Sequence, residues 1–167
     1  MPALAGKWES GRMAALASSI LCRIVGMDLP RREVRTLLDP VRGKRVAWTP
    51  EEEVRQGLLR LLLGPVGIPA TCLKVELSLN GLDVRVRDRV DVVAFYREVP
   101  VLLCECKAPG IALDADVSAQ LRRYLRLLPA TWVLATNGHQ FRLHAFKDGL
   151  WQERQELSSW EAMKPPV

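Results

Sequence analysis

The segment that most constrains this chain is an apolar run that ends in two charges. It reads Val-Leu-Leu-Cys-Glu-Cys-Lys over Val101–Lys107, a pattern typical of a buried β-strand. Side chains alternate between the two faces of a strand, so Glu105 and Lys107 point to the same side. Burying two charges is costly unless they are paired or used. The segment therefore predicts a strand that carries a functional carboxylate and amine at its C-terminal end.

A second carboxylate lies on the strand expected just before this one, over Arg89–Tyr96. The two strands are expected to form an antiparallel hairpin, in which opposing residues share a face. A plain two-residue turn at Glu98–Val99 would place Asp91 opposite Cys106, on the wrong face. A shared site of Asp91 and Glu105 therefore predicts a bulge or a three-residue turn near Val99.

Hydrophobic periodicity and turn signals predict the remaining elements. Thr49 is the expected N-cap of the first helix, because Pro50 and three glutamates follow it. The expected order is helix, three strands, helix, then two or three strands, which is an α/β fold with a central mixed sheet flanked by helices. The remaining expected elements are helix Pro50–Leu63, strand Cys72–Leu79, helix Asp114–Leu128, and strands Thr131–Asn137, Gln140–Lys147 and Leu150–Glu156.

The two ends of the chain carry weaker signals. Residues 1–26 are expected to be an N-terminal extension, and residues 27–157 a single domain. Within this domain, Arg31–Leu38 favours a short helix and Val41–Trp48 a small hairpin. Residues 158–167 are expected to form a loose tail.

Composition narrows the function classes. The net charge of +5 is mild support for a polyanionic partner, and no apolar run reaches the length of a membrane-spanning helix. Cys104 and Cys106 lie one pleat apart on a strand, which is poor geometry for a disulfide. One such pair is also too few ligands for a structural zinc site. We expect buried free thiols, as in a cytoplasmic protein.

A carboxylate on one strand and Glu-x-Lys on the next is the layout of a metal-dependent nuclease site. Mg²⁺ prefers hard oxygen ligands, which Asp91, Glu105 and the backbone carbonyl of Cys106 can supply, and Mn²⁺ is a substitute. Lys107 can orient or deprotonate a water molecule and offset charge on a phosphate. These residue types predict hydrolysis of phosphodiester bonds.

Five segments of the chain, taken in sequence order, resemble the N-terminal nuclease domain of type I restriction-enzyme R subunits. That family belongs to the PD-(D/E)xK superfamily. The resemblance covers most of the chain and implies a restriction-endonuclease-like fold. One departure is Val90, which stands where the superfamily pattern has proline. The segments are Thr49–Gln56, Arg89–Asp91, Glu105–Pro109, Gln120–Tyr124 and Thr136–Gly138.

The resemblance implies metal ligation by Asp91 and Glu105 and a catalytic role for Lys107. It also implies that Gln120 and Tyr124, spaced i,i+4 on the second helix, support catalysis.

A glutamate of the first helix is also expected to approach the site. Glu52 is the first choice, with Glu51 and Glu53 as alternatives. Glu52 also fits a capping box with Thr49. Glu76 is a further candidate for the metal shell.

The implied substrate is DNA, cut by a restriction-type endonuclease. Cutting both strands of a duplex usually takes two active sites, so a homodimer is one expected assembly. A helicase or another restriction-system subunit is a further partner that the resemblance implies, and no membrane partner is expected. The alternative function is a nuclease-fold module that binds nucleic acid or a protein partner without cutting. Basic residues of the second helix either follow a phosphate backbone or form a solvated face; these are Arg122, Arg123 and Arg126.

Overall fold

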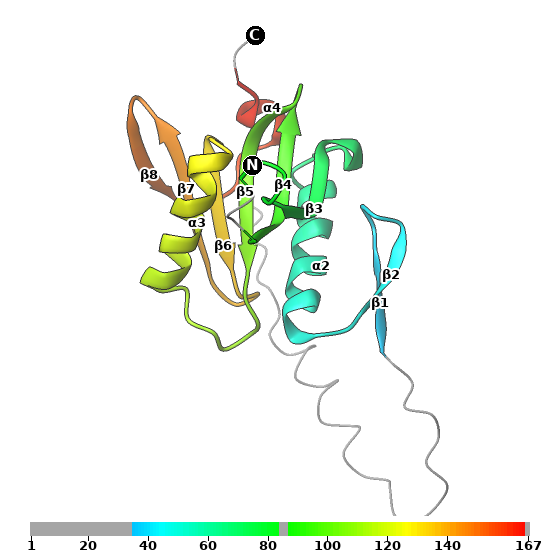
Figure 1. Ribbon diagram of the computed structural model, residues 1–167. Helices are drawn as coiled ribbons and strands as arrows, with labels where there is room; N and C mark the ends of the chain where they lie inside the picture. The colour runs from blue at the N-terminus through cyan, green and yellow to red at the C-terminus, as the bar shows by residue number, and fades with distance from the viewer. Residues whose placement is uncertain (1–34, 84–86, 166–167) are drawn as a thin grey trace, which may run out of the picture. The chain divides into compact units, whose positions relative to one another are not determined.

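The described part of the chain is built around a six-stranded sheet (Figure 1). The computed structural model describes residues 35–83 and 87–165. All of them belong to the second of the two units, Met1–Glu33 and Val34–Val167, into which the chain divides. The predicted extension over residues 1–26 lies outside the described residues, as does Cys22.

The strands lie in the sheet in the order in which they occur along the chain. Every neighbouring pair is antiparallel except β5 with β6, which is parallel. The sheet is therefore mixed, as the sequence predicted. The strands are β3 (Leu73–Ser78), β4 (Arg89–Tyr96), β5 (Val99–Cys106), β6 (Trp132–Thr136), β7 (Phe141–Lys147) and β8 (Leu150–Arg154).

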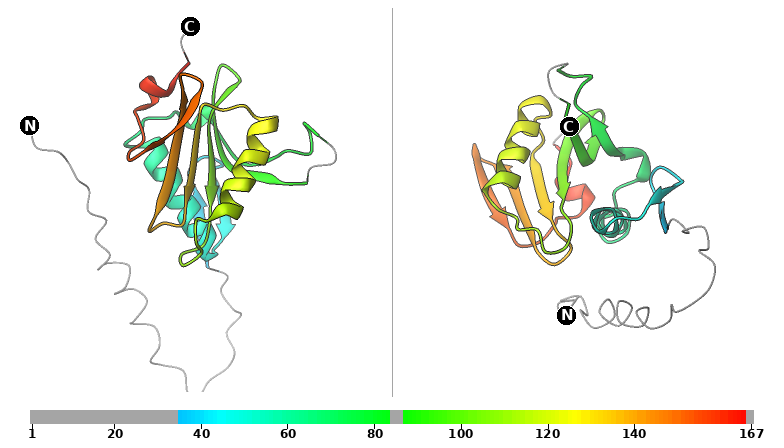
Figure 2. Two further views of the ribbon diagram at one scale, coloured as in Figure 1. Left: turned by 90° about the vertical axis from the view of Figure 1, so that its left-hand side faces the viewer. Right: turned by 60° about the horizontal axis from the view of Figure 1, so that its bottom comes forward.

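Helices cover both faces of this sheet. Helix α3 (Ala115–Leu127) makes the crossover that the parallel pair β5–β6 requires, and α2 (Pro50–Leu63) packs on the opposite face (Figure 2). Leu102 of β5 faces α2, and its neighbour Leu103 faces α3. Burial on both faces explains why the β5 sequence is apolar almost throughout.

Helix α2 begins and ends where the sequence predicted. The Thr49 side chain accepts a hydrogen bond from the backbone N–H of Glu52 at 3.0 Å, which satisfies one of the free N–H groups of the first turn. Gly64 follows the last turn. Leu59 and Leu62 have no exposed surface, so the apolar stripe of the helix forms the centre of the core on this face.

The turn between β4 and β5 contains the predicted irregularity. Only Arg97 and Glu98 separate the strands, and both have positive φ (47° and 68°), as in the turns that suit a two-residue hairpin. The pairing register then shifts between Ala94 and Phe95, which leaves one extra residue on β5 as a β-bulge. The predicted bulge is confirmed, and the three-residue turn is not used.

The first hairpin differs from the prediction. Its strands are β1 (Thr36–Asp39) and β2 (Lys44–Ala47), so Val41–Trp48 is not itself the hairpin. The predicted helix Arg31–Leu38 is wrong over its described part, because that part enters β1. The cause is Asp39, whose side chain accepts hydrogen bonds from the backbone N–H groups of the next two non-proline residues. Such an aspartate starts a turn rather than ending a helix.

The predicted loose tail is wrong between residues 160 and 163. These residues form a short helix, α4 (Trp160–Met163), and its two terminal side chains are buried in the core on the α2 side. The backbone N–H of Trp160 donates to Val66 O at 2.8 Å. The Trp160 ring packs edge-on against the Tyr96 ring, with the ring centroids 6.2 Å apart. Two large apolar side chains three residues apart were the signal for this helix.

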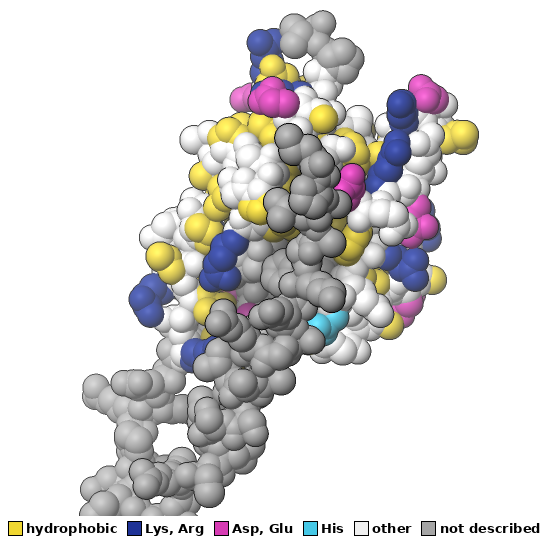
Figure 3. Space-filling model, turned by 180° about the vertical axis from the view of Figure 1, so that it is seen from behind, with side chains coloured by type: hydrophobic (Ala, Val, Ile, Leu, Met, Phe, Trp, Pro, Cys, Tyr) yellow, Lys and Arg dark blue, Asp and Glu magenta, His cyan; other side chains and the backbone are white. Residues whose placement is uncertain are grey.

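Other features of the described residues bear on function. A short 3₁₀ helix, η1 (Ala70–Cys72), precedes β3. No helix in these residues is long and apolar enough to cross a membrane. Among the side chains visible in Figure 3, basic, acidic and apolar groups are interspersed. Cys72, Cys104 and Cys106 are free thiols, as predicted; the predicted burial is confirmed for Cys104 and Cys106, whereas Cys72 is only partly buried.

Candidate active site

The C-terminal end of β5 meets the start of β4, and this meeting places two carboxylates together. Val92 pairs with Cys104, so the register puts Asp91 across from Glu105. This is the register that the bulge was predicted to produce. The backbone N–H of Cys106 donates to Asp91 Oδ2 at 2.6 Å. The Asp91 side chain thus takes the place of a backbone partner where the two strands part.

The other oxygen of Asp91 binds an arginine that sequence reasoning did not select. Arg55 of α2 donates from Nη2 to Asp91 Oδ1 at 2.7 Å. Asp91 is 9% exposed and Arg55 is 6% exposed, so this is a buried, charge-assisted pair. Each oxygen of Asp91 accepts one hydrogen bond, and each keeps a second lone pair.

Glu105 is nearly buried, and only one of its two carboxylate oxygens has a hydrogen-bond partner among the described residues. It is 4% exposed, and its Oε1 accepts a hydrogen bond from Lys107 Nζ at 2.7 Å. Its Oε2 is buried and has no hydrogen-bond partner among the described residues. Burial, followed by the charge of Asp91, raises the pKa of Glu105 to about 7, although Lys107 acts in the opposite direction. A buried carboxylate oxygen without a donor is an expensive feature in a folded protein.

Lys107 begins a chain of hydrogen bonds that runs into α3. Its Nζ also donates to Gln120 Oε1 at 3.0 Å, and Gln120 Nε2 bonds to the Tyr124 hydroxyl. The hydroxyl donates in turn to the backbone carbonyl of Arg89 at 3.0 Å. Burial raises the pKa of Tyr124 well above its ordinary value of 10, so the hydroxyl stays protonated. This series of hydrogen bonds fixes the amide of Gln120 with its oxygen towards Lys107.

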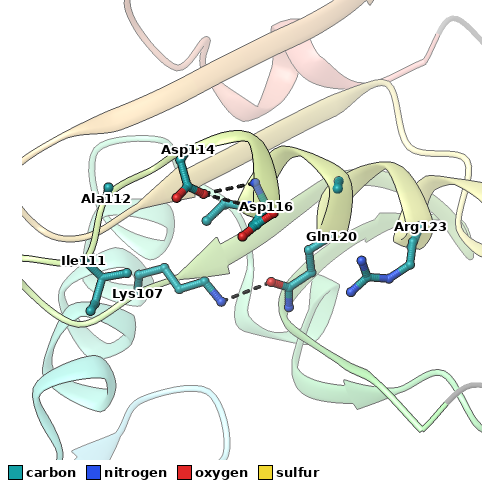
Figure 4. Close-up of a pocket in the computed structure, with 9 residues that line it drawn as sticks. Lys107, Ile111, Ala112, Asp114, Asp116, Gln120 and Arg123 are labelled. Carbon is teal, nitrogen blue, oxygen red and sulfur yellow. Dashed lines mark hydrogen bonds between the residues drawn. The ribbon is translucent and has the colours of Figure 1, made fainter.

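Lys107 and Gln120 line a cavity of about 400 Å³ beside α3 (Figure 4). Arg123, which also lines it, lies next to Gln120 along the helix, and Asp114 and Asp116 stand at the helix start. Asp114 is the N-cap, accepting from the backbone N–H of Asp116 at 3.0 Å. The cavity is therefore lined by both basic and acidic side chains.

The loop that connects β5 to α3 is held in place by the β6–β7 turn and by β7. Asn137 Nδ2 donates to Ile111 O at 2.8 Å, and Arg142 Nε donates to Leu113 O at 2.8 Å. Asn137 itself is 5% exposed. The Thr-Asn-Gly segment therefore has a structural role, because its asparagine anchors the loop that follows Lys107.

The glutamates at the start of α2 point in different directions. Glu52 is buried against Arg55 and Gln56, and its side chain is bonded to both. Burial is the largest influence on the pKa values of Glu105 and Lys107, but the charge of Glu51 is among the smaller causes that raise both. The charge of Glu51 is thus one influence on both residues, and the expectation that Glu52 approaches the site stays a prediction. The remaining alternative, Glu53, accepts a hydrogen bond from the Trp48 indole at 3.0 Å.

A second polar cluster adjoins α2, and sequence reasoning missed most of it. Asp39 has no exposed surface, and it accepts from Arg42 Nε at 2.6 Å and from Gln56 Nε2 at 3.3 Å. Arg42 also donates to Glu76, the residue considered for the metal shell. Glu76 therefore serves at least to tie the β1–β2 turn to β3. The spacing of Glu52, Arg55 and Gln56 on one helix face was a usable signal.

The donor set at the β4–β5 end fits Mg²⁺ better than a metal that needs several protein ligands. Within residues 35–83 and 87–165, no group of three or more His, Cys, Asp or Glu side chains could hold a metal ion. Mg²⁺ is usually held by one or two carboxylates together with water and substrate phosphate. Asp91 and Glu105 offer two carboxylates, and the unpartnered Glu105 Oε2 is an open donor position.

The region that contains the site matches a known protein family. The family model described as type I restriction enzyme R protein N terminus matches residues 50–158. A search of curated proteins and a search of solved structures each found no match. The matched range includes α2, the whole six-stranded sheet and all the candidate site residues. The chain belongs to the family of type I restriction enzyme R protein N-terminal domains.

Proposed function

We propose that this protein is a metal-dependent endonuclease of the PD-(D/E)xK type that hydrolyses phosphodiester bonds in DNA. The family places the chain in a restriction-system context. The observation that carries the proposal is the meeting of Asp91, Glu105 and Lys107 at one end of the sheet, with Glu105 Oε2 buried and without a donor.

Each residue has a role that its position suits. Asp91 and Glu105, with the carbonyl of Cys106, would hold Mg²⁺, and Mn²⁺ would bind in its place. The bound ion would supply a Lewis acid next to the scissile phosphate. Lys107 Nζ lies between Glu105 and Gln120, where it can orient a water molecule and donate to a phosphate oxygen. Gln120 and Tyr124 keep the amine in that position.

A second candidate function has one observation in its favour. Both oxygens of Asp91 already accept hydrogen bonds, from Arg55 and from the Cys106 backbone, so the carboxylate is satisfied without a metal ion. A module that binds DNA or another restriction-system subunit without cutting would leave it in this state.

A cleavage assay separates the two functions. Supercoiled plasmid and linear DNA are incubated with the purified chain in Mg²⁺, in Mn²⁺ and in EDTA, and DNA binding is measured in parallel by fluorescence anisotropy. The proposed nuclease should nick or linearise DNA only when a metal ion is present. Binding without cleavage in either metal would support the non-cleaving module and contradict the proposed function.

A further inference from the structure

Arg55 differs from an arginine in a surface ion pair in its burial and in the number of carboxylates that it binds. Its guanidinium is buried, and its two terminal nitrogens face different carboxylates: Nη2 bonds to Asp91 and Nη1 to Glu52. Nη2 also approaches Glu51 at 3.4 Å. A planar fork can hold two carboxylates in a fixed relative orientation, which the single ammonium of lysine cannot do.

Arg55 and the β5 backbone together determine how Asp91 points. One oxygen of Asp91 is fixed by Cys106 N–H and the other by Arg55. With both oxygens held, the carboxylate has little rotational freedom, yet it keeps lone pairs for a further ligand.

Simple stabilisation does not account well for this pair. A buried ion pair often contributes no more to stability than apolar side chains of the same size would. A fixed positive charge beside Asp91 also opposes the binding of a cation there. The arrangement is better explained by geometry, because residues that orient a metal ligand usually matter about 10–100-fold for affinity or activity.

We propose that Arg55 is a positioning residue that presents the Asp91 carboxylate to the metal ion, and that Glu52 acts through Arg55 and not as a ligand. This inference rests on the proposed metal-dependent function. It gives Glu52 and Arg55 distinct tasks on one helix face: Glu52 anchors the guanidinium, and the guanidinium anchors Asp91.

Calorimetric titration of the full chain with Mn²⁺ tests this. Arg55→Lys keeps the charge but loses the fork, and we expect it to weaken Mn²⁺ affinity about 10–100-fold with unchanged stoichiometry per folded molecule. Glu52→Gln should weaken affinity about tenfold, at the lower end of the same range. The double variant should bind no more weakly than Arg55→Lys alone. Arg60→Lys, at an exposed position of the same helix, should bind like the wild type.

The readouts separate positioning from a purely structural role. A structural role would lower the thermal unfolding temperature and the fraction of binding-competent protein while leaving the Kd of that fraction unchanged. If Arg55→Lys does not fold, the Kd of Glu52→Gln for Mn²⁺ tests the positioning role instead. Wild-type Kd in the folded variants, with wild-type cleavage intact, would overturn this inference alone. A wild type that binds no Mn²⁺ would overturn both this inference and the proposed function.

Discussion

Lys107→Met is expected to reduce the rate of metal-dependent DNA cleavage by at least about 100-fold, the usual effect of removing one group that stabilises transition-state charge. Lys107 Nζ lies 2.7 Å from Glu105 Oε1 and 3.0 Å from Gln120 Oε1. The methionine side chain has similar length but no donor, so the cavity keeps its shape and loses the charge of Lys107. Initial rates on supercoiled plasmid at saturating Mg²⁺ measure the effect.

Lys147→Met is the matched control for this experiment. Lys147 is exposed on β7, and its replacement should leave the rate close to that of the wild type. A Lys107→Met protein that cleaves at the control rate would show that the amine takes no part in the reaction.

Glu105→Gln is expected to stabilise the metal-free protein at alkaline pH. The folded-state pKa of Glu105 is about 7, above its ordinary value of 4.5, so between these values the folded protein holds a proton that the unfolded chain has released. The unfolding free energy of the wild type should therefore fall as the pH rises through this window. Relative to the variant, the total loss should be about 3 kcal/mol by pH 8.

Urea denaturation in EDTA at pH 5 and pH 8 measures this difference. Glu153→Gln, at an exposed position of β8, should follow the pH dependence of the wild type. A Glu105→Gln protein whose stability relative to the wild type is the same at both pH values would contradict the raised pKa. The predicted gain would mean that Glu105 is retained for function at a cost in stability.

Much of the fold could be predicted because local patterns and long-range packing agree. The Thr49 cap, the glutamates of the first turn and the apolar stripe all predict α2, and the helix forms as expected. The bulge near Val99 was predictable because alternation on two strands allows Asp91 and Glu105 to share a site only with an extra residue.

The parts that sequence reasoning missed depend on partners that are distant along the chain. The full burial of Asp39 was not predicted, because its partner Gln56 lies 17 residues away. Trp160 looked like part of a loose tail because its backbone partner is Val66.

The contacts of the first-helix glutamates were a further feature that sequence reasoning did not predict. Glu51, Glu52 and Glu53 are adjacent, so spacing alone could not show that the first two bond to Arg55 and that Glu53 bonds to Trp48. These contacts depend on where α2 lies against the neighbouring elements, which no local pattern encodes.

Electron paramagnetic resonance of Mn²⁺ tests the central claim, that Asp91 and Glu105 form a divalent metal site, most directly. Free aqueous Mn²⁺ gives a strong signal, which weakens when the ion is bound by protein. Titrating the wild-type chain into Mn²⁺ should reduce the signal in a saturable way, and excess Mg²⁺ should restore it. Asp91→Asn and Glu105→Gln should each abolish most of the reduction. A signal that the wild type leaves unchanged, or that Glu105→Gln reduces as fully as the wild type does, would contradict the metal site.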